Sequence, residues 1–584
     1  MQPSLLIMDA VRHAGRATCL EPVVFDGHIG ALHLPKPQAP RGVAVVLCPP
    51  VGRDARCAYR PLYLFAEALA AQGVPVLRYD HLGDGDSMPL DAQADCWPLW
   101  VAGVEQAAAF ARAHTGAQRL VLAGLRIGAS LAACAAHTVR PDGLMLLAPL
   151  PTGRGWVREL QAAASKVGAP QPADGALEVD GLRLSSATVV ALDDLDLRRL
   201  GPSGAETFLA MPTPDPRLAV SLGARVRSVP FDGYAELFRE AHLNAPPGAV
   251  FEAAGVWLEG IAAATPDAGP APPPAPAWLI AEDWTEGPVT FGEDLRGVLC
   301  LPARPAGRQA VIFGNAGGDP RAGIGGFCAS ACRALAGRGV AALRFDFAGL
   351  GESASPGAWR SPIHDLSRTS DFQAAADVLA GEGYGEVTLA GVCSGGYQAL
   401  RAAIEDARFR RIVTINASPV WRPDRPFATQ LFGETAQNLP SGSRRAPAGA
   451  IGARAIGAGL VRWLRRRLRL RRLDAACRSS RAEIARIAAD GARVRLLFGS
   501  NDAAWDGVEE DFGLQGRWLA RQRGVEVALI RNFDRGPVSR AGQDLALAEI
   551  LRFVGSPPTS DAAAAQANSG GSGLATSADR QAAI

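Results

Sequence analysis

The stretch EVTLAGVCSGGYQALRAA (386–403) contains the side chain best suited to chemistry, the thiol of Cys393. Its pattern predicts a buried strand, a sharp glycine-flanked turn and a helix. A cysteine at the apex of such a turn can act as a nucleophile, since a few per cent of free thiol is thiolate at neutral pH. Placing Ser394 at the apex would put Val392 where glycine is required. The spacing therefore favours Cys393 over Ser394 as the apex residue.

The elements that must position this cysteine occur twice in the chain. Four segments recur in the same order: VVFDGHIGALHLP (23–35) as VTFGEDLRGVLCLP (289–302), VAVVLCPPVG (43–52) as QAVIFGNAGG (309–318), VPVLRYDHLGDGDS (74–87) as VAALRFDFAGLGES (340–353), and LVLAGLRIGASLAACAA (120–136) as VTLAGVCSGGYQALRAA (387–403). Strands that alternate with helical stretches at this pitch predict a mostly parallel sheet with helices on both faces. We expect an α/β protein with two tandem domains, residues 1–263 and 280–555.

Two further segments separate or follow these domains. Residues 264–279 are too rich in Pro and Ala to pack, and predict a semi-rigid linker. Residues 556–584 bury too little apolar surface to become ordered, so a disordered tail is expected there.

Bulk composition excludes several classes of protein. The chain has 584 residues and a net charge of +2, so its overall charge does not indicate a polyanionic partner, and we expect no nucleic acid. It has neither a signal-peptide pattern at its start nor about 18 consecutive apolar residues, which predicts a cytoplasmic protein. Ten cysteines without CxxC pairs or regular spacing predict no metal site and no disulfide framework. No cofactor is expected.

The repeated strand–Gly-x-nucleophile-x-Gly–helix segment and the upstream RFDFAGLGES-type loop resemble the α/β-hydrolase superfamily, particularly serine aminopeptidase-like hydrolases. The resemblance covers nearly all of residues 20–265 and 280–555. The motif LAGLRIGASLA (122–132) is similar, more narrowly, to accessory hydrolases of bacterial exosortase and exopolysaccharide loci, in which an arginine commonly occupies the apex. The superfamily resemblance implies a nucleophile at the elbow, an acid after a later strand and a histidine after the last strand.

In the second half, the resemblance implies a cysteine-dependent site like that of proteins similar to dienelactone hydrolase. Cys393 would be the nucleophile, and Asp502 in VRLLFGSNDAAWD (494–506) the acid, with Asp506 as the second choice. The backbone N–H of Ser394 would be one oxyanion donor. The other donor would come from the loop formed by Asn315, Ala316 and Gly317.

The base is missing from its usual place in the second half. In VALIRNFDRGPVSR (527–540), Arg535 follows Asp534 where the histidine is expected. An arginine can lower the pKa of a nearby thiol, but it cannot pass a proton to a leaving group. His364, expected to open the helix before the elbow strand, is the remaining candidate base, and a helix-capping or surface role is the alternative.

The first half has the opposite defect. Arg126 occupies the apex and cannot be a nucleophile, whereas the resemblance places Asp215 at the acid position and His242 at the base position. Arg126 would either hold a carboxylate or phosphate in a former active-site cleft or pair with Asp215 as a structural contact. A composite site, with His242 serving Cys393, would require the two clefts to face each other, and a tandem repeat gives no reason to expect that.

The interval before the Asp502 strand is where this superfamily places a lid, so residues of about 420–490 are expected to form a helical cap. It includes the basic, partly apolar segment 456–472. This segment is either a solvated cap helix or a peripheral contact with an anionic membrane surface or glycan.

Two functions follow from these observations. The first is an esterase- or thioesterase-like acyl hydrolase, or an acyltransferase, that attacks a small-molecule acyl substrate through Cys393, with a role in exopolysaccharide metabolism implied by the LAGLRIGASLA motif. The second is an inactive tandem pseudo-hydrolase that acts as a binding or scaffold protein. The oligomeric state is left open.

Overall fold

The computed structural model describes residues 17–36, 40–167, 171–269, 271–354, 363–364, 366–421, 475–500, 502–530, 533 and 538–555. The basic segment 456–472, the catalytic-histidine position at Arg535 and the tail 556–584 lie outside the described residues. Among the residues that are described, no helix is long and apolar enough to cross a membrane.

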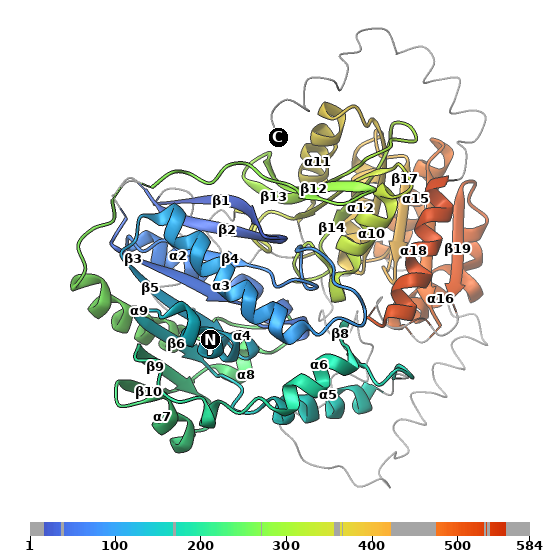
Figure 1. Cartoon of the computed structure of the whole chain (residues 1–584). Coiled ribbons are helices and arrows are strands. Elements are labelled where there is room, and N and C mark those ends of the chain that lie inside the picture. Colours follow the sequence, from blue (N-terminus) through green and yellow to red (C-terminus); the bar gives the residue numbers. More distant parts are fainter. Residues whose placement is uncertain are drawn as a thin grey trace, which may run out of the picture.

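The first half forms one twisted sheet, shown in blue to green in Figure 1. Within the described residues its strands, in spatial order, are β1 (Thr18–Phe25), β2 (His28–Pro35), β4 (Val76–Tyr79), β3 (Val43–Cys48), β5 (Arg119–Leu125), β6 (Gly143–Leu147), β9 (Glu206–Met211) and β10 (Val226–Pro230). Pairing is antiparallel between β1, β2 and β4 and parallel from β4 to β10. A small antiparallel hairpin, β7 (Leu177–Val179) and β8 (Leu182–Leu184), is inserted between β6 and β9.

Helices cover both faces of this sheet, because its central strands are apolar on both sides. Along β3, Val43, Val45 and Leu47 face one layer and the alternate residues face the other. The helices of this half are α2 (Gly52–Ala71), α3 (Cys96–Thr115), α4 (Ile127–Val139), α5 (Gly153–Val167), α6 (Ser186–Asp193), α7 (Pro216–Leu222), α8 (Tyr234–Leu237) and α9 (Gly248–Ala263), with a short 3-10 turn η1 (Leu197–Arg199). The first layer is formed by α2 and α9, and the second by α3, α4 and α5.

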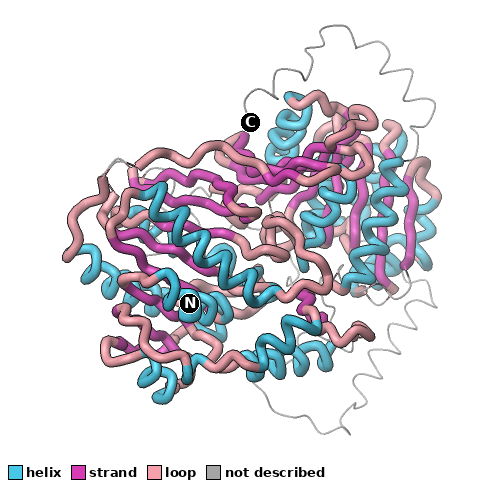
Figure 2. The backbone as a smooth tube through the Cα atoms, in the orientation of Figure 1, coloured by secondary structure: helices cyan, strands magenta, loops and turns pink. Residues whose placement is uncertain are grey.

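The second half repeats this architecture. Its described strands are, in spatial order, β11 (Leu279–Ile280), β12 (Trp284–Phe291), β13 (Leu295–Pro302), β15 (Ala341–Asp346), β14 (Gln309–Gly314), β16 (Glu386–Val392), β17 (Arg411–Ile415), β18 (Arg493–Gly499) and β19 (Val525–Ile530). Its helical segments are η2 (Ile324–Gly326), α10 (Phe327–Ala336), α11 (Thr369–Gly381), α12 (Ser394–Glu405), α15 (Ala475–Ala489), α16 (Ala503–Phe512), η4 (Leu514–Gly516), α17 (Arg517–Ala520) and α18 (Arg540–Gly555). Figure 2 shows the strands of this half between layers of helices. The predicted mostly parallel sheets with helices on both faces are confirmed.

The two halves meet through the same loop of each repeat. Arg78 donates to Glu352 (2.9 Å), and Arg344, at the position equivalent to Arg78, donates to Asp86 (2.7 Å) at the position equivalent to Glu352. All four side chains are buried. Both loops follow the carboxyl end of a parallel strand, which is where ligand sites of open α/β sheets lie. The contact therefore brings the functional edges of the two sheets together, which the tandem repeat did not predict.

The Pro/Ala-rich linker is extended, but it lies against the first half. The backbone N–H of Ala268 donates to Pro40 O (2.9 Å), and His114 Nδ1 lies 3.0 Å from Pro272 O. Most of its described residues are exposed, so these contacts fix the linker to the first half at two points without packing it into a core. Its backbone groups find partners in the first half that its composition did not indicate.

Candidate active site

Cys393 stands at the turn between β16 and α12, with φ 51° and ψ −118°. A positive φ is strained for a residue with a side chain, and close packing on both sides imposes it here. A Cβ atom on Gly395 would lie 2.5 Å from the carbonyl oxygen of Asn315, so only glycine fits. The predicted elbow is thus present, with Cys393 at its apex and partly exposed.

The electrostatic surroundings of the thiol disfavour the thiolate. Burial, and then the nearby carboxylates of Asp502 and Asp319, raise the pKa of Cys393 to about 12, while a hydrogen bond from the Ser394 N–H acts in the opposite direction. The thiol is therefore protonated at neutral pH. Nucleophilic attack from this site requires a base that removes the proton as the new bond forms.

Asp502 lies at the start of α16, directly after β18, as the sequence predicted for the acid. Its Oδ1 accepts a hydrogen bond from the Ala504 N–H (2.7 Å), which caps the helix. Its charge acts on the Cys393 thiol, so the structure brings these two predicted residues together.

The predicted oxyanion loop lies beside the elbow because β14 and β16 are neighbours, with Gly314 paired with Gly391. The Gly317 N–H donates to Ser394 Oγ at 2.6 Å, so that donor is already used by the elbow itself. Asn315 braces the loop, since its Nδ2 donates to Asp319 O (2.8 Å) and its Oδ1 accepts from the Phe347 N–H (2.6 Å).

His364 does not occupy the predicted position at the start of a helix. Its ring stacks on Trp421 at 4.1 Å between centroids and lies 5.4 Å from the ring of Tyr397, whereas α11 begins only at Thr369. The aromatic contacts hold it on the side of α12 that also lines a pocket with Arg401. The helix-opening role is therefore wrong.

His242, from the first half, lies against the oxyanion loop of the second half. A Cβ atom on Gly318 would approach Ala241 O at 2.8 Å and the backbone nitrogen of His242 at 3.0 Å. A Cβ atom on Gly317 would lie 4.0 Å from His242 Nδ1. The two glycines therefore allow close approach of the His242 segment. Sequence reasoning assigned this histidine to the first half and did not predict this contact.

The first elbow has the same backbone but different chemistry. Arg126 has φ 55° and ψ −121°, and its guanidinium donates to Asp54 (3.0 Å) and Glu159 (2.6 Å). Asp54 is partly buried, and burial raises the pKa of its carboxyl group although Arg126 opposes that shift. Two carboxylates already satisfy the guanidinium, which leaves it poorly suited to hold another anion.

Asp215 does not pair with Arg126, which corrects the structural alternative drawn from the sequence. Its Oδ2 accepts from Arg198 Nη2 (2.7 Å) and its Oδ1 from the Leu218 N–H (3.0 Å), at the start of α7. It is topologically equivalent to Asp502, since each residue caps the helix after the corresponding strand. Arg198, which lies just before β9 in a region without a motif, diverts this carboxylate to the protein surface.

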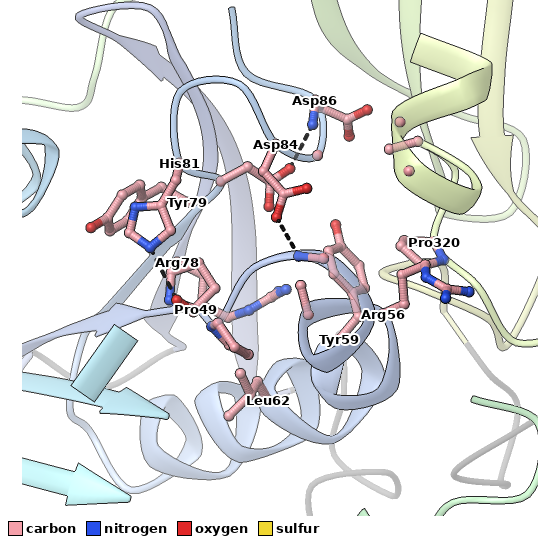
Figure 3. A pocket seen from close by; sticks show the side chains of 18 of the residues that line it. Pro49, Arg56, Tyr59, Leu62, Arg78, Tyr79, His81, Asp84, Asp86 and Pro320 are labelled. Atoms are coloured by element: carbon pink, nitrogen blue, oxygen red, sulfur yellow. Dashed lines mark hydrogen bonds between the residues drawn. The ribbon is translucent and has the colours of Figure 1, made fainter. Parts of the chain in front are cut away.

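A small cavity of about 50 Å³ lies between the halves, next to the loop after β4. Figure 3 shows Arg56 and Tyr59 of α2 and Pro320 of the second half among the residues that line it. Arg56 also donates to Asp319 (3.2 Å), whose charge acts on Cys393. The only sequence signal for this contact was the position of Asp319 directly after the GNAGG loop. No group of three metal-ligating side chains occurs in the described part of the chain.

Comparisons with known proteins agree with this geometry. Residues 56–171 match the family model for serine aminopeptidase, and residues 312–492 match the model for the alpha/beta hydrolase fold. The search of curated proteins found no match. Neither family model concerns an exosortase system, so the narrower resemblance stays a prediction.

Solved structures that are similar each cover less than half of the chain. Est1E from Butyrivibrio proteoclasticus, with ferulic acid bound, is 17% identical over 42% of this chain and 100% of its own, at a TM-score of 0.33. Proline iminopeptidase from Mycobacterium smegmatis is 17% identical over 42% of this chain and 99% of its own (TM-score 0.31). A putative dienelactone hydrolase from Klebsiella pneumoniae is 15% identical over 48% and 100% (TM-score 0.30). The two family matches, one in each half, agree with two α/β-hydrolase-like regions in tandem.

Proposed function

We propose that the second domain is an acyl hydrolase that uses Cys393 as its nucleophile on esters or thioesters. The observation that carries the proposal is the partly exposed thiol at the apex of a strained elbow, within the field of the Asp502 carboxylate. Arg126 has nearly the same strained backbone, so it is the thiol side chain that distinguishes this elbow from that of the first half.

The reaction proceeds in two steps. The Cys393 sulfur bonds to the acyl carbon, the bond from that carbon to the alcohol oxygen or thiol sulfur breaks, and the leaving group takes the proton released by the Cys393 thiol. Water then attacks the thioester, the C–S bond breaks, the carboxylic acid leaves, and the sulfur regains a proton. If an alcohol replaces water in the second step, the same site is an acyltransferase. Acylated glycans among the substrates would test the exopolysaccharide role implied by the LAGLRIGASLA motif.

A second candidate function is that of a tandem pseudo-hydrolase that binds ligands without turnover. The high pKa of Cys393 and the closed Arg126 site favour it. Under this alternative, the Cys393 thiol has only a structural role, because it packs at a turn that the fold requires.

The test compares ester and thioester hydrolysis by the full chain with that by Cys393→Ala. A general aryl acetate and an acyl thioester are the probes, and labelling by iodoacetamide followed by mass spectrometry reports the thiol directly. Cys19→Ser is the matched control, because Cys19 is also partly exposed but lies on β1. Hydrolysis that disappears in Cys393→Ala and persists in Cys19→Ser supports the hydrolase. Hydrolysis that is absent in all three proteins leaves the pseudo-hydrolase in its place. Hydrolysis that is unchanged in Cys393→Ala overturns Cys393 as the nucleophile and points to another catalytic group.

A further inference from the structure

We propose that the active site is shared between the two domains, with His242 of the first domain acting as the proton-transferring base for Cys393 of the second. The inference rests on the proposed function. It assigns one working site to the pair of domains, each of which lacks one member of the usual triad.

The position of His242 carries the argument. Its backbone and ring lie against Gly317 and Gly318, the loop that follows β14. The Gly317 N–H in turn binds Ser394 Oγ at 2.6 Å, and Ser394 is the residue next to Cys393. The imidazole is therefore linked to the elbow through Gly317, which it contacts and whose N–H binds the residue next to Cys393.

The first domain holds the segment that carries this histidine in place with three hydrogen bonds to α2. Arg53 donates to the carbonyl oxygen of Phe238 (3.1 Å) and to the carboxylate of Glu240 (3.3 Å), and Asn244 Nδ2 donates to the carbonyl oxygen of Cys57. His242 lies between these anchors, in a turn closed by the Leu243 N–H on Glu240 O (2.7 Å). A side chain used in proton transfer needs such fixed support.

The junction beside His242 is also fixed. Arg56 of the first domain pairs with Asp319 of the second, next to the glycine loop, and the buried Arg78–Glu352 and Arg344–Asp86 pairs join the same edges. Charged groups near the histidine segment include Glu240, Arg53, Arg56 and Asp319. Asp319, together with Asp502 at the start of α16, also acts on the thiol and opposes its spontaneous ionisation. A proton acceptor that stays at the site solves this problem without a preformed thiolate.

One histidine can carry out all the proton transfers that the reaction needs. Neutral His242 takes the proton from the Cys393 thiol as the sulfur bonds to the acyl carbon, and returns it to the departing alkoxide or thiolate. It then takes a proton from the attacking water and gives it back to the sulfur as the thioester breaks. Transfers of this kind accelerate a reaction by about 10²–10⁴-fold.

The experiment uses the full chain and the variants His242→Asn and His242→Ala. We expect either change to lower kcat/KM for an ester or thioester by about 10²–10⁴-fold, and added imidazole to restore part of the loss in His242→Ala. The second readout is the pH dependence of iodoacetamide labelling of Cys393. The labelling profile of the native chain should move to higher pH in His242→Asn, because the base that assists the thiol is lost.

His137→Asn is the matched control, because His137 is exposed on α4 of the same domain. Activity that falls in Cys393→Ala but stays within about twofold of native in His242→Asn, with an unchanged labelling profile, overturns the shared site and leaves the Cys393 hydrolase standing. Activity that does not depend on Cys393 overturns the proposed function instead. Thermal unfolding of each variant separates these outcomes from misfolding: a His242 variant that unfolds early and is not rescued by imidazole counts against a chemical role.

Discussion

The two elbows of this protein have nearly the same backbone and opposite chemistry. Arg126 has φ 55° and ψ −121°, and Cys393 has φ 51° and ψ −118°. The first apex is a cation closed off by Asp54 and Glu159, and the second is a thiol. The strained turn thus persists without a nucleophile, because close packing of its flanking glycines requires it. Elbow geometry by itself is a property of the fold, and activity must be argued from the side chains around it.

At their junction the two halves are alike. The Arg78–Glu352 pair and the Arg344–Asp86 pair use equivalent positions of the repeat. Arg321 breaks this likeness, since it comes from the second half alone and contacts Asp86, Asp346 and Glu352 at 2.8–2.9 Å. The halves are therefore joined by a repeated contact with one added cation at its centre.

The largest effect is expected from removing that cation. Arg321→Met leaves three buried carboxylates with less positive charge, and breaking a buried ion pair from one side costs about 3–5 kcal/mol in the free energy of unfolding. Denaturant unfolding measures the loss. Arg304→Met is the control, since Arg304 and Asp283 form an exposed pair worth about 1 kcal/mol or less. Equal losses in both variants would contradict a central role for Arg321.

Asp80 and Asp346 lie at equivalent positions of the two repeats. We expect their replacement by asparagine to change the free energy of unfolding in opposite directions. Burial, with Asp86 and Asp84 nearby, raises the pKa of Asp80 to about 8. In the unfolded chain that pKa is about 3.9. At a pH between these two values, Asp80 is protonated in the folded state and ionised in the unfolded state. The free energy of unfolding therefore falls as pH rises from about 4 to about 8.

Asp80→Asn should remove that fall. Relative to the native chain, we expect the free energy of unfolding of the variant to rise by about 2 kcal/mol between pH 5 and pH 8. A complete shift would add roughly 1.4 kcal/mol for every pH unit in this interval. Asp346→Asn should instead lose about 1–3 kcal/mol, because Asp346 pairs with Arg321 at 2.9 Å and accepts from Asn315 Nδ2 at 2.7 Å. Unfolding at several pH values measures both. A loss of stability in Asp80→Asn at pH 8 would show that Asp80 is ionised in the fold.

The sequence predicted the parts of this molecule that depend on local pattern. Alternating apolar runs gave both sheets, and glycine spacing gave both elbows, because each depends on neighbours close in the chain. Asp502 followed from the same logic, as a carboxylate at the end of a strand. Its equivalent Asp215 was placed at the correct strand end but was given the wrong partner, since Arg198 reaches it from a segment without any motif.

The position of His242 was beyond this kind of reasoning, because it depends on how two domains meet. That orientation is fixed by buried ion pairs, and the sequence shows many arginines and carboxylates without showing which of them pair. One signal was available: Arg78 and Arg344, with Asp86 and Glu352, recur at equivalent positions of the two repeats. Buried charges repeated in this way are a reason to expect a symmetric contact between the copies.

Restoring a thiol to the first elbow tests whether the difference between the domains is confined to the apex. Arg126→Cys should add a second site of iodoacetamide labelling but no ester hydrolysis above that of the native chain. The reason is that Asp215 is paired with Arg198, and His242 lies against the other domain. Hydrolysis by Arg126→Cys in a Cys393→Ala background would contradict this reasoning and show that the first cleft keeps a working base.

The smallest effect should come from the two equivalent acids. The Asp502 carboxylate disfavours the Cys393 thiolate, so Asp502→Asn should lower the pKa of the thiol by about one unit and speed its alkylation at a fixed pH. Asp215→Asn should leave the labelling of Cys393 unchanged, because Asp215 lies at the start of α7 with Arg198. Labelling that slows in Asp502→Asn would contradict this electrostatic effect and mean that the carboxylate assists ionisation of the thiol. Labelling that does not change in either variant would show that Asp502 does not act on the Cys393 thiol. Asp502 and Asp215 would then both be helix-capping residues without a role in the site.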